Sequence, residues 1–185
     1  MQLSPNIKIK RKRVHFRYDR AISRVKPFLQ IIRFVLLVSF LLASTPNAHW
    51  QSYNQGLQQA KTEKKYVLIQ FYATWCELCH QMEQDLFTQA NLRQKLTAHF
   101  VAVRVNLDSN QQVVYQGRHL PEKRLFIEYQ APGPPTMVVL QPDGKVIARI
   151  PGLLSAKELD LLLGYIGSGA FRTMNIKAYQ KQLSS

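Results

Sequence analysis

Cysteine is scarce in this chain of 185 residues. The sequence contains only two, and both lie in segment 75–80, which reads Trp-Cys-Glu-Leu-Cys-His. Two cysteines three positions apart are not a stapling framework, because the small ring they close constrains little of the unfolded chain. The pair therefore indicates a chemical role, and not a structural one. Three readings are open: a redox-active dithiol, a haem attachment site completed by His80, and half of a zinc site.

Acidic residues are also few, and the excess of basic over acidic residues is concentrated near the N-terminus. The chain has 25 Lys and Arg against 11 Asp and Glu, a formal net charge of +14. Up to residue 33 there are ten bases and one acid, which leaves fifteen bases against ten acids in the remainder. The rest of the chain has no basic stripe interleaved with aromatic platforms, so nucleic acid is not an expected partner.

A long hydrophobic run is missing as well. Segment 28–43 is apolar except at Gln30, Arg33 and Ser39, and its dense core covers only residues 34–43. Ten residues are short for a membrane span and typical of the apolar part of a signal peptide, whereas the long basic flank and a poor cleavage site favour an uncleaved anchor. We predict a basic cytoplasmic n-region at 1–27 and a signal peptide or signal anchor at 28–48. Either way the rest is exported, so the protein is periplasmic, secreted, or tethered to the inner membrane by residues 28–43.

About 135 residues follow this leader, which is close to the usual size of one domain. We predict a single domain at 49–171 and a C-terminal tail at 172–185, packed by Phe171 and Tyr179. The apolar and polar patterning predicts helices and strands in alternation. The expected helices are 52–64, 75–87, 91–98, 121–129 and 155–166, and the expected strands are 66–72, 100–107, 137–140 and 145–150. Segment 108–120 is expected to be a long polar connection that faces a partner, and Ser155 with Glu158 forms a capping box.

The cysteine pair lies where a buried strand gives way to a helix. Segment 66–72 is nearly continuous in apolar residues, as in strands covered on both faces, and Met82, Leu86 and Phe87 recur at helical spacing. The free N–H groups and the dipole at a helix start favour an anion, which would stabilise a thiolate at Cys76. Cys76 is therefore the expected attacking sulfur, and Cys79, one turn later, the resolving one.

Residues 71–80 resemble the strand–Trp-Cys-x-x-Cys–helix signature of the thioredoxin-like family. A second match is the segment 133–136, Gly-Pro-Pro-Thr, followed by an apolar strand and the turn 142–145. The run 79–87 is similar to that of periplasmic thiol:disulfide reductases such as the C-terminal domain of DsbD, with a carboxylate four residues after the second cysteine. The resemblance implies an α/β, thioredoxin-like fold with a central mixed sheet flanked by helices and an extra N-terminal helix.

The resemblance also implies roles for particular residues. Cys76 and Cys79 form the redox disulfide, Trp75 shapes an apolar lip, and Pro134, Pro135 and Thr136 present the backbone to a client. Pro135 is the expected cis-proline. Many cytosolic thioredoxins carry a buried Asp six residues before the first cysteine, where this chain has Gln70. Glu83, one helical turn after Cys79, is the candidate to exchange a proton with it in place of that acid.

These features together predict an exported thiol–disulfide oxidoreductase that works mainly as a reductase. Its expected partners are a disulfide-containing client protein and a membrane electron donor of the disulfide-relay type, and no cofactor is expected. Two rival classes stay open: a c-type haem protein and a non-catalytic binding module on the same scaffold. A haem attachment site would account for His80. It would not account for the buried strand 66–72, or for segment 133–140, in which Pro-Pro-Thr leads into a strand. A zinc site lacks two ligands, because His49, His99 and His119 are scattered.

Overall fold

The computed structural model describes residues 50–184. The predicted n-region at 1–27 and the signal peptide or anchor at 28–48 lie outside the described residues. Within residues 50–184, no helix is both long enough and apolar enough to cross a membrane.

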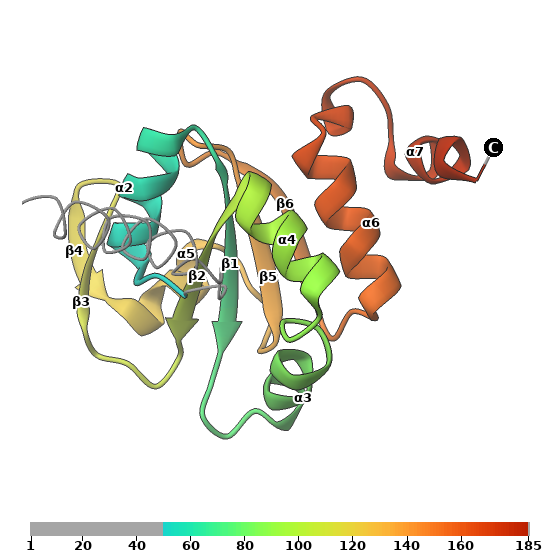
Figure 1. Ribbon diagram of the computed structural model, residues 1–185. Coiled ribbons are helices and arrows are strands. Elements are labelled where there is room, and N and C mark those ends of the chain that lie inside the picture. Colours follow the sequence, from blue (N-terminus) through green and yellow to red (C-terminus); the bar gives the residue numbers. More distant parts are fainter. Residues whose placement is uncertain (1–49, 185) are drawn as a thin grey trace, which may run out of the picture. The chain divides into compact units, whose positions relative to one another are not determined.

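A four-stranded mixed sheet forms the centre of the domain (Figure 1). Its strand order is β2-β1-β5-β6, with β1 parallel to β2 and antiparallel to β5, and with β5 antiparallel to β6. Gln51 adds a single parallel bridge to Val103 of β2. The strands are β1 (Tyr66–Tyr72), β2 (Phe100–Asn106), β5 (Thr136–Leu140) and β6 (Val146–Pro151). The predicted mixed sheet is therefore confirmed.

Strand β1 is buried on both faces, as its apolar run predicts. Because successive side chains of a strand point to opposite faces, Val67, Ile69 and Phe71 join one core and Leu68 joins the other. The first core lies under helix α2 and the second under helices α3, α4 and α6. Gln70 faces the second core, where it is almost completely buried.

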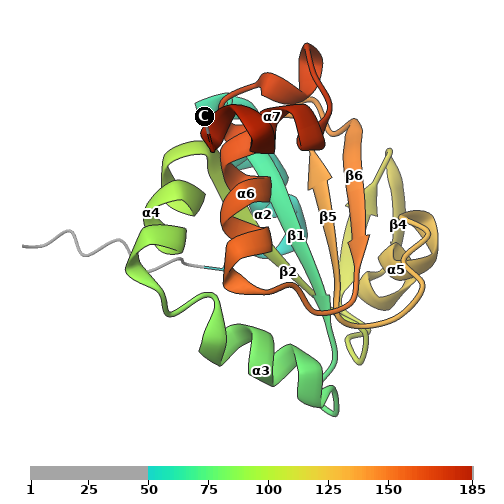
Figure 2. The ribbon, with the colours of Figure 1, turned by 90° about the vertical axis from the view of Figure 1, so that its right-hand side faces the viewer.

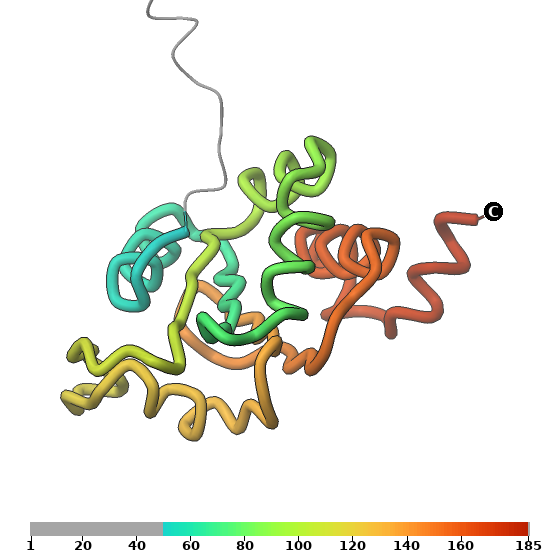
Figure 3. Tube along the Cα trace, turned by 90° about the horizontal axis from the view of Figure 1, so that it is seen from below, coloured from blue at the N-terminus to red at the C-terminus, as the bar shows by residue number. Residues whose placement is uncertain are grey.

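Helices cover both faces of the sheet. In Figure 2, α6 lies in front of β1 and α2 lies behind it, and in Figure 3 the cyan turns of α2 and the orange-red turns of α6 are on opposite sides of the strands. The expected N-terminal helix, α2, is present. The helices named so far are α2 (Tyr53–Glu63), α3 (Glu77–Asp85), α4 (Ala90–His99) and α6 (Ala156–Gly167). The expected capping box is also present, because Ser155 and Glu158 bond to each other's backbone N–H groups at the start of α6.

The expectation of a plain connection at 108–120 is wrong, because this segment contains a hairpin. Strands β3 (Gln112–Tyr115) and β4 (Arg118–Pro121) pair antiparallel across a two-residue turn. Both turn residues, Gln116 and Gly117, have positive φ (48° and 78°), as a tight hairpin turn of this kind requires. Gln is uncommon at such a position, so the usual Asn-Gly or Asp-Gly signal was missing from the sequence.

The hairpin packs onto the domain instead of projecting from it. Val113 and Leu120 are buried in the core under α2. The side chain of Asn54 on α2 accepts from the Val114 N–H (2.9 Å) and donates to the Val114 carbonyl (2.7 Å), which satisfies the outer edge of β3. Side-chain partners of this kind protect an edge strand from pairing with another chain.

The predicted helix 121–129 is shorter than expected. Pro121 ends β4, and a 3₁₀ turn at Glu122–Arg124 leads into the single-turn helix α5 (Leu125–Glu128). Proline fits at this strand end because an edge position does not need its N–H. The sequence pattern could not separate this use of proline from its use at a helix start.

The C-terminal segment packs against the domain through the two expected rings. Phe171 lies edge-on to Tyr66 with centroids 5.9 Å apart, and Tyr179 lies 5.5 Å from Tyr165. Phe171 belongs to a 3₁₀ turn, Ala170–Arg172, and Tyr179 to helix α7 (Ile176–Leu183), which was not predicted.

Candidate active site

The two cysteines lie at the end of β1 where the chain turns into α3. The Ala73 carbonyl accepts a hydrogen bond from the Cys76 N–H (3.1 Å), which closes the turn, and Cys76 is the N-cap of α3. Cys76 and Cys79 are joined in a disulfide. The expected strand–turn–helix context of the pair is therefore confirmed.

The cap position distinguishes the two sulfurs chemically. The Cys79 N–H points at the Cys76 Sγ (3.2 Å), so the sulfur of Cys76 takes the place of the oxygen that usually caps a helix. In the reduced protein the same N–H and the helix dipole would stabilise a thiolate at Cys76. Exposure does not separate the two residues, since Cys76 is 6% exposed and Cys79 is 4% exposed in the disulfide form.

A carboxylate from the next strand anchors the turn that holds Trp75. Asp108, two residues after the end of β2, accepts from the Thr74 N–H (2.9 Å), the Thr74 hydroxyl (2.8 Å) and the Trp75 Nε1–H (3.1 Å). The hydrogen bonds from Thr74 hold the pKa of Asp108 below its usual range. The His80 ring is turned to the Thr74 carbonyl, 3.0 Å away. Trp75 is thereby fixed beside the disulfide although it is 68% exposed.

The proline segment lies at the same end of the sheet. The Pro134–Pro135 peptide bond is cis, as the resemblance implies. Thr136 opens β5 and pairs with Phe71 of β1, so Pro135 is level with the last residue of β1, where the dithiol turn begins. The Pro135 carbonyl accepts from the Gly152 N–H (2.8 Å), which brings the segment after β6 alongside.

Three large apolar side chains are exposed on the segments that surround the disulfide. Trp75 precedes Cys76, Leu78 lies between the cysteines, and Leu153 follows the glycine that bonds to Pro135. Large apolar side chains exposed on neighbouring segments are candidates for contact with another protein. Leu153 was not a predicted site residue, because its place next to Pro135 depends on the pairing of β5 with β6.

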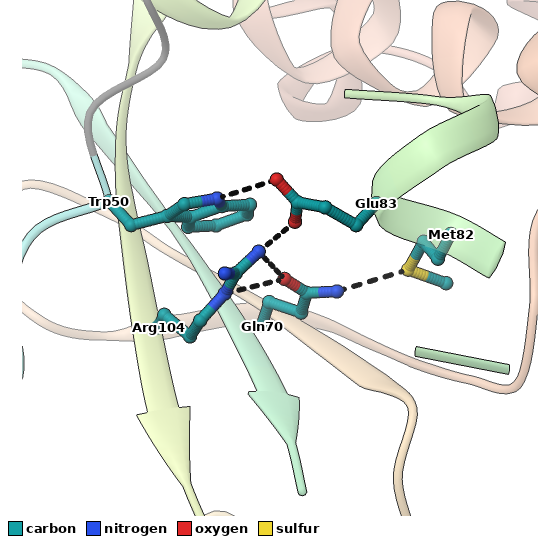
Figure 4. Close-up of polar contacts among 5 residues, drawn as sticks. All are labelled: Trp50, Gln70, Met82, Glu83 and Arg104. Atoms are coloured by element: carbon teal, nitrogen blue, oxygen red, sulfur yellow. Dashed lines mark hydrogen bonds and ion pairs between the residues drawn. The ribbon is translucent and has the colours of Figure 1, made fainter. Parts of the chain in front are cut away.

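A polar cluster connects α3, the helix that carries Cys79, to β1 and β2 (Figure 4). Arg104 of β2 is paired in register with Gln70 of β1 and donates to the Gln70 Oε1 from Nε (3.2 Å) and Nη2 (3.1 Å). The Arg104 Nη2 also forms an ion pair with the Glu83 carboxylate. The other Glu83 oxygen accepts from the Trp50 Nε1–H at 3.3 Å, and the Gln70 amide N lies 3.6 Å from the Met82 sulfur.

Two aromatic rings complete the surroundings of Arg104. Its guanidinium carbon lies 4.2 Å from the centroid of Trp50 and 5.0 Å from that of Tyr72, in the range of cation–π contacts. Burial lowers the pKa of Arg104 from its usual value. A guanidinium remains protonated in proteins, so the cluster holds a charged Arg104 against a carboxylate.

The sequence did not indicate Arg104, Asp108 or Trp50 as part of the site. Arg104 and Gln70 are the polar residues that interrupt two otherwise apolar strands, and this was the available signal. These two polar residues indicate a cluster only once the register of β1 with β2, which pairs Gln70 with Arg104, is known. Among the described residues, no group of three or more His, Cys, Asp and Glu side chains is arranged to hold a metal ion.

A family model described as a thioredoxin-like domain matches residues 53–167. The chain belongs to the thioredoxin-like domain family. The match covers the disulfide, the cis-proline and the β5–β6 hairpin, so the resemblance identified from the sequence is confirmed.

Relatives of this thioredoxin-like chain include thiol:disulfide interchange proteins. Over 90 residues it is 33% identical to DsbD of Pseudomonas fluorescens, a match that covers 48% of this chain and 14% of the relative. Over 111 residues it is 25% identical to the disulfide bond reductase DsbH of Chlamydia pneumoniae, covering 56% of this chain and 63% of the relative. The chain thus spans only a small part of the length of DsbD.

Solved structures agree on the fold. A thioredoxin-fold protein from Helicobacter pylori superposes with a TM-score of 0.56 at 25% identity, covering 65% of this chain and 84% of that one. A thioredoxin from Thermus thermophilus gives a TM-score of 0.54 at 24% identity, covering 65% and 87%. The predicted thioredoxin-like fold is therefore confirmed.

Proposed function

We propose that this thioredoxin-like protein is an exported thiol–disulfide oxidoreductase that works mainly as a reductase of client disulfides. The observation that carries the proposal is the Cys76–Cys79 disulfide at the start of α3, with the sulfur of Cys76 in the cap position. Similarity to DsbD and DsbH, both named for disulfide chemistry, supports the same reaction class.

The reaction needs two successive exchanges. In the reduced protein the Cys76 thiolate attacks one sulfur of a client disulfide, which forms a mixed disulfide and releases the other client sulfur as a thiolate that takes up a proton. Cys79 then loses its proton and attacks the Cys76 sulfur. The Cys76–Cys79 disulfide forms, and the client leaves with both sulfurs reduced. Two electrons have passed to the client, and dithiol exchange with a membrane donor restores the protein.

The surface around the disulfide fits an extended polypeptide. Trp75, Leu78 and Leu153 offer exposed apolar side chains, and Pro135 is level with the last residue of β1, at the same end of the sheet as the disulfide. Neither Pro134 nor Pro135 has a backbone N–H, and the Pro135 carbonyl is already bonded to Gly152. The backbone contact with a client is therefore acceptor-only at these two positions, and the apolar side chains contribute more of the affinity.

Glu77 supports the reducing direction. It is exposed in the first turn of α3, between the two cysteines. A negative charge at this place opposes a strongly stabilised Cys76 thiolate and so disfavours a strong oxidant. The basic segment 1–27 and the apolar segment 28–43 are the grounds for export, and they favour a client and an electron donor on the outer side of the inner membrane.

Trapping of mixed disulfides tests this proposal. Cys79→Ala leaves Cys76 able to attack and removes the resolving sulfur, so a larger species that disappears with dithiothreitol should accumulate on non-reducing gels. Cys76→Ala is the matched control and should trap nothing. Trapping by Cys76→Ala alone would reverse the two roles, and trapping by neither would favour a binding module. A Soret band that survives denaturation of the purified protein would instead indicate haem.

A further inference from the structure

The polar cluster between α3, β1 and β2 fixes the carboxylate that was predicted to exchange a proton with Cys79. Glu83 lies one helical turn after Cys79 on α3, so the two side chains share a face of the helix. Both carboxylate oxygens of Glu83 are engaged, one by Arg104 and one by the Trp50 indole (Figure 4). The carboxylate is therefore held in one place although its side chain is 41% exposed.

The negative charge of this cluster lies at a different position from that in proteins with a buried acid in place of Gln70. Gln70, which cannot titrate, stands on β1 where many members of the family carry an acid, and its carbonyl oxygen accepts two hydrogen bonds from Arg104. Gln70 thus serves as a neutral support for the guanidinium, and Glu83 supplies the negative charge. A nearby cation and a donated hydrogen bond both favour the ionised form of a carboxylate. Only the ionised form can accept a proton.

We propose that Arg104 is a positioning residue for the resolving step: it holds the Glu83 carboxylate ionised and in place so that this carboxylate takes the proton of Cys79. The inference rests on the proposed thiol–disulfide exchange. When Cys79 attacks the Cys76 sulfur of the mixed disulfide, its proton passes to Glu83 and the client thiolate leaves. Glu83 afterwards returns the proton to solvent, to which it is partly open.

The groups that face Glu83 from the packed elements are few. Arg104 approaches from β2, and Tyr72 of β1 lies on the guanidinium. Cys79 lies on the same helix, and the His80 ring is turned away to the Thr74 carbonyl. Of these groups, Arg104 carries the positive charge and makes the direct contact. Its removal should therefore change the protonation of Glu83 more than any other single substitution in the cluster.

The resolving step can be followed with Ellman's reagent and the full-length reduced protein. Attack by Cys76 releases one thionitrobenzoate and leaves a mixed disulfide, and attack by Cys79 releases the second. The rate of the second release, measured by stopped flow between pH 5 and 9, should fall on the acid side as Glu83 becomes protonated. Arg104→Gln should move this fall to higher pH by about one unit, and Arg104→Lys, which keeps the charge, should leave it close to the wild-type position.

A double-mutant cycle separates positioning from general damage. Glu83→Gln should slow the second release and remove its acid-side fall. Arg104→Gln should then have no further effect in the Glu83→Gln background, because the group it acts through is gone. Lys95→Gln removes a cation from another ion pair, between α4 and α6, and should leave the profile unchanged. If Arg104→Gln does not fold, Trp50→Phe removes only the indole donor to Glu83 and should shift the profile in the same direction by a smaller amount.

Two results would overturn the inference. One is an Arg104→Gln profile, or a Trp50→Phe profile where that variant is used, that superimposes on the wild type. The other is equal slowing by Arg104→Gln in the presence and absence of Glu83, which would assign Arg104 to packing alone. Failure of the proposed function looks different, since the wild-type protein would then release no second thionitrobenzoate at any pH.

Discussion

At the scale of single residues, Asp108 is the side chain that orients the exposed surface of the site. One carboxylate receives three hydrogen bonds from Thr74 and Trp75, across 34 and 33 positions of sequence. Because Trp75 is largely exposed, packing alone would not fix its ring. The contact of Trp75 with a client should therefore depend on the charge state of Asp108.

The pH dependence of this contact has a definite sign. The pKa of Asp108 is lowered from its usual value of 3.8 by the hydrogen bonds from Thr74. The stabilising effect of the ionised Asp108 on this turn is therefore fully present above pH 3.8. It is lost as the pH falls through the lower pKa that Asp108 has in the folded protein. In a Trp50→Phe background, the fluorescence of Trp75 should stay constant from pH 7 to about pH 4 and change below that. Asp108→Asn should abolish this acid transition; a transition of the same midpoint in that variant would assign it to another group.

The sequence indicated the candidate site residues that belong to short motifs, and it did not indicate those that strand pairing brings beside them. Cys76, Cys79 and Trp75 share one short motif, and Pro135 is marked by a second, so local pattern was sufficient. Arg104 lies on β2 and Asp108 follows the end of that strand, so their place beside Glu83 and Trp75 depends on the register of β1 with β2. A single sequence does not contain that register in readable form.

At the scale of elements, the close approach of α2 to β2 depends on Gly56. A Cβ at this position would lie inside the contact distance of the Val103 Cγ2 atom. Valine has few alternative rotamers, so β2 or the helix would have to move. The buried glycine is thus a packing requirement in a helix where alanine is otherwise preferred.

Gly56→Ala should therefore destabilise the protein although alanine favours a helix by about 1 kcal/mol. Overpacking of a core typically costs about 1–3 kcal/mol, and we expect a net loss of about 1 kcal/mol in the free energy of unfolding measured with urea. In a Val103→Ala background the same substitution should be neutral or stabilising, because the clashing methyl group is absent. Equal losses in both backgrounds would contradict the packing explanation.

Elements with a strong apolar period were predicted to within a few residues, whereas elements set by backbone conformation were not. Strand β1 and helix α6 follow from hydrophobic pattern and capping. The β3–β4 hairpin depends on Gln116 adopting positive φ and on the Asn54 side chain that borders it. Neither feature leaves a periodic trace in the sequence.

At the scale of the whole molecule, the predicted leader at 28–48 would determine on which side of the membrane the site works. We predict that a reporter active only outside the cytoplasm is active when fused after Ser185. Replacing the bases between Lys8 and Lys26 by neutral residues should reduce that activity severalfold, since positive flanks keep the N-terminus in the cytoplasm. Unchanged reporter activity after this replacement would contradict the assigned role of the basic segment, and an inactive fusion of the unaltered chain would contradict export.

In the proposed function, Cys76 and Cys79 form a dithiol that donates electrons to client disulfides. Its most direct test is the reduction potential of the pair, measured by equilibration with glutathione and with a thioredoxin of known potential and followed by alkylation of the free thiols. We expect a reducing couple near that of thioredoxin, about −270 mV, so that the pair stays largely oxidised in a balanced glutathione buffer. A potential near −120 mV, that of a strong disulfide donor, would contradict it.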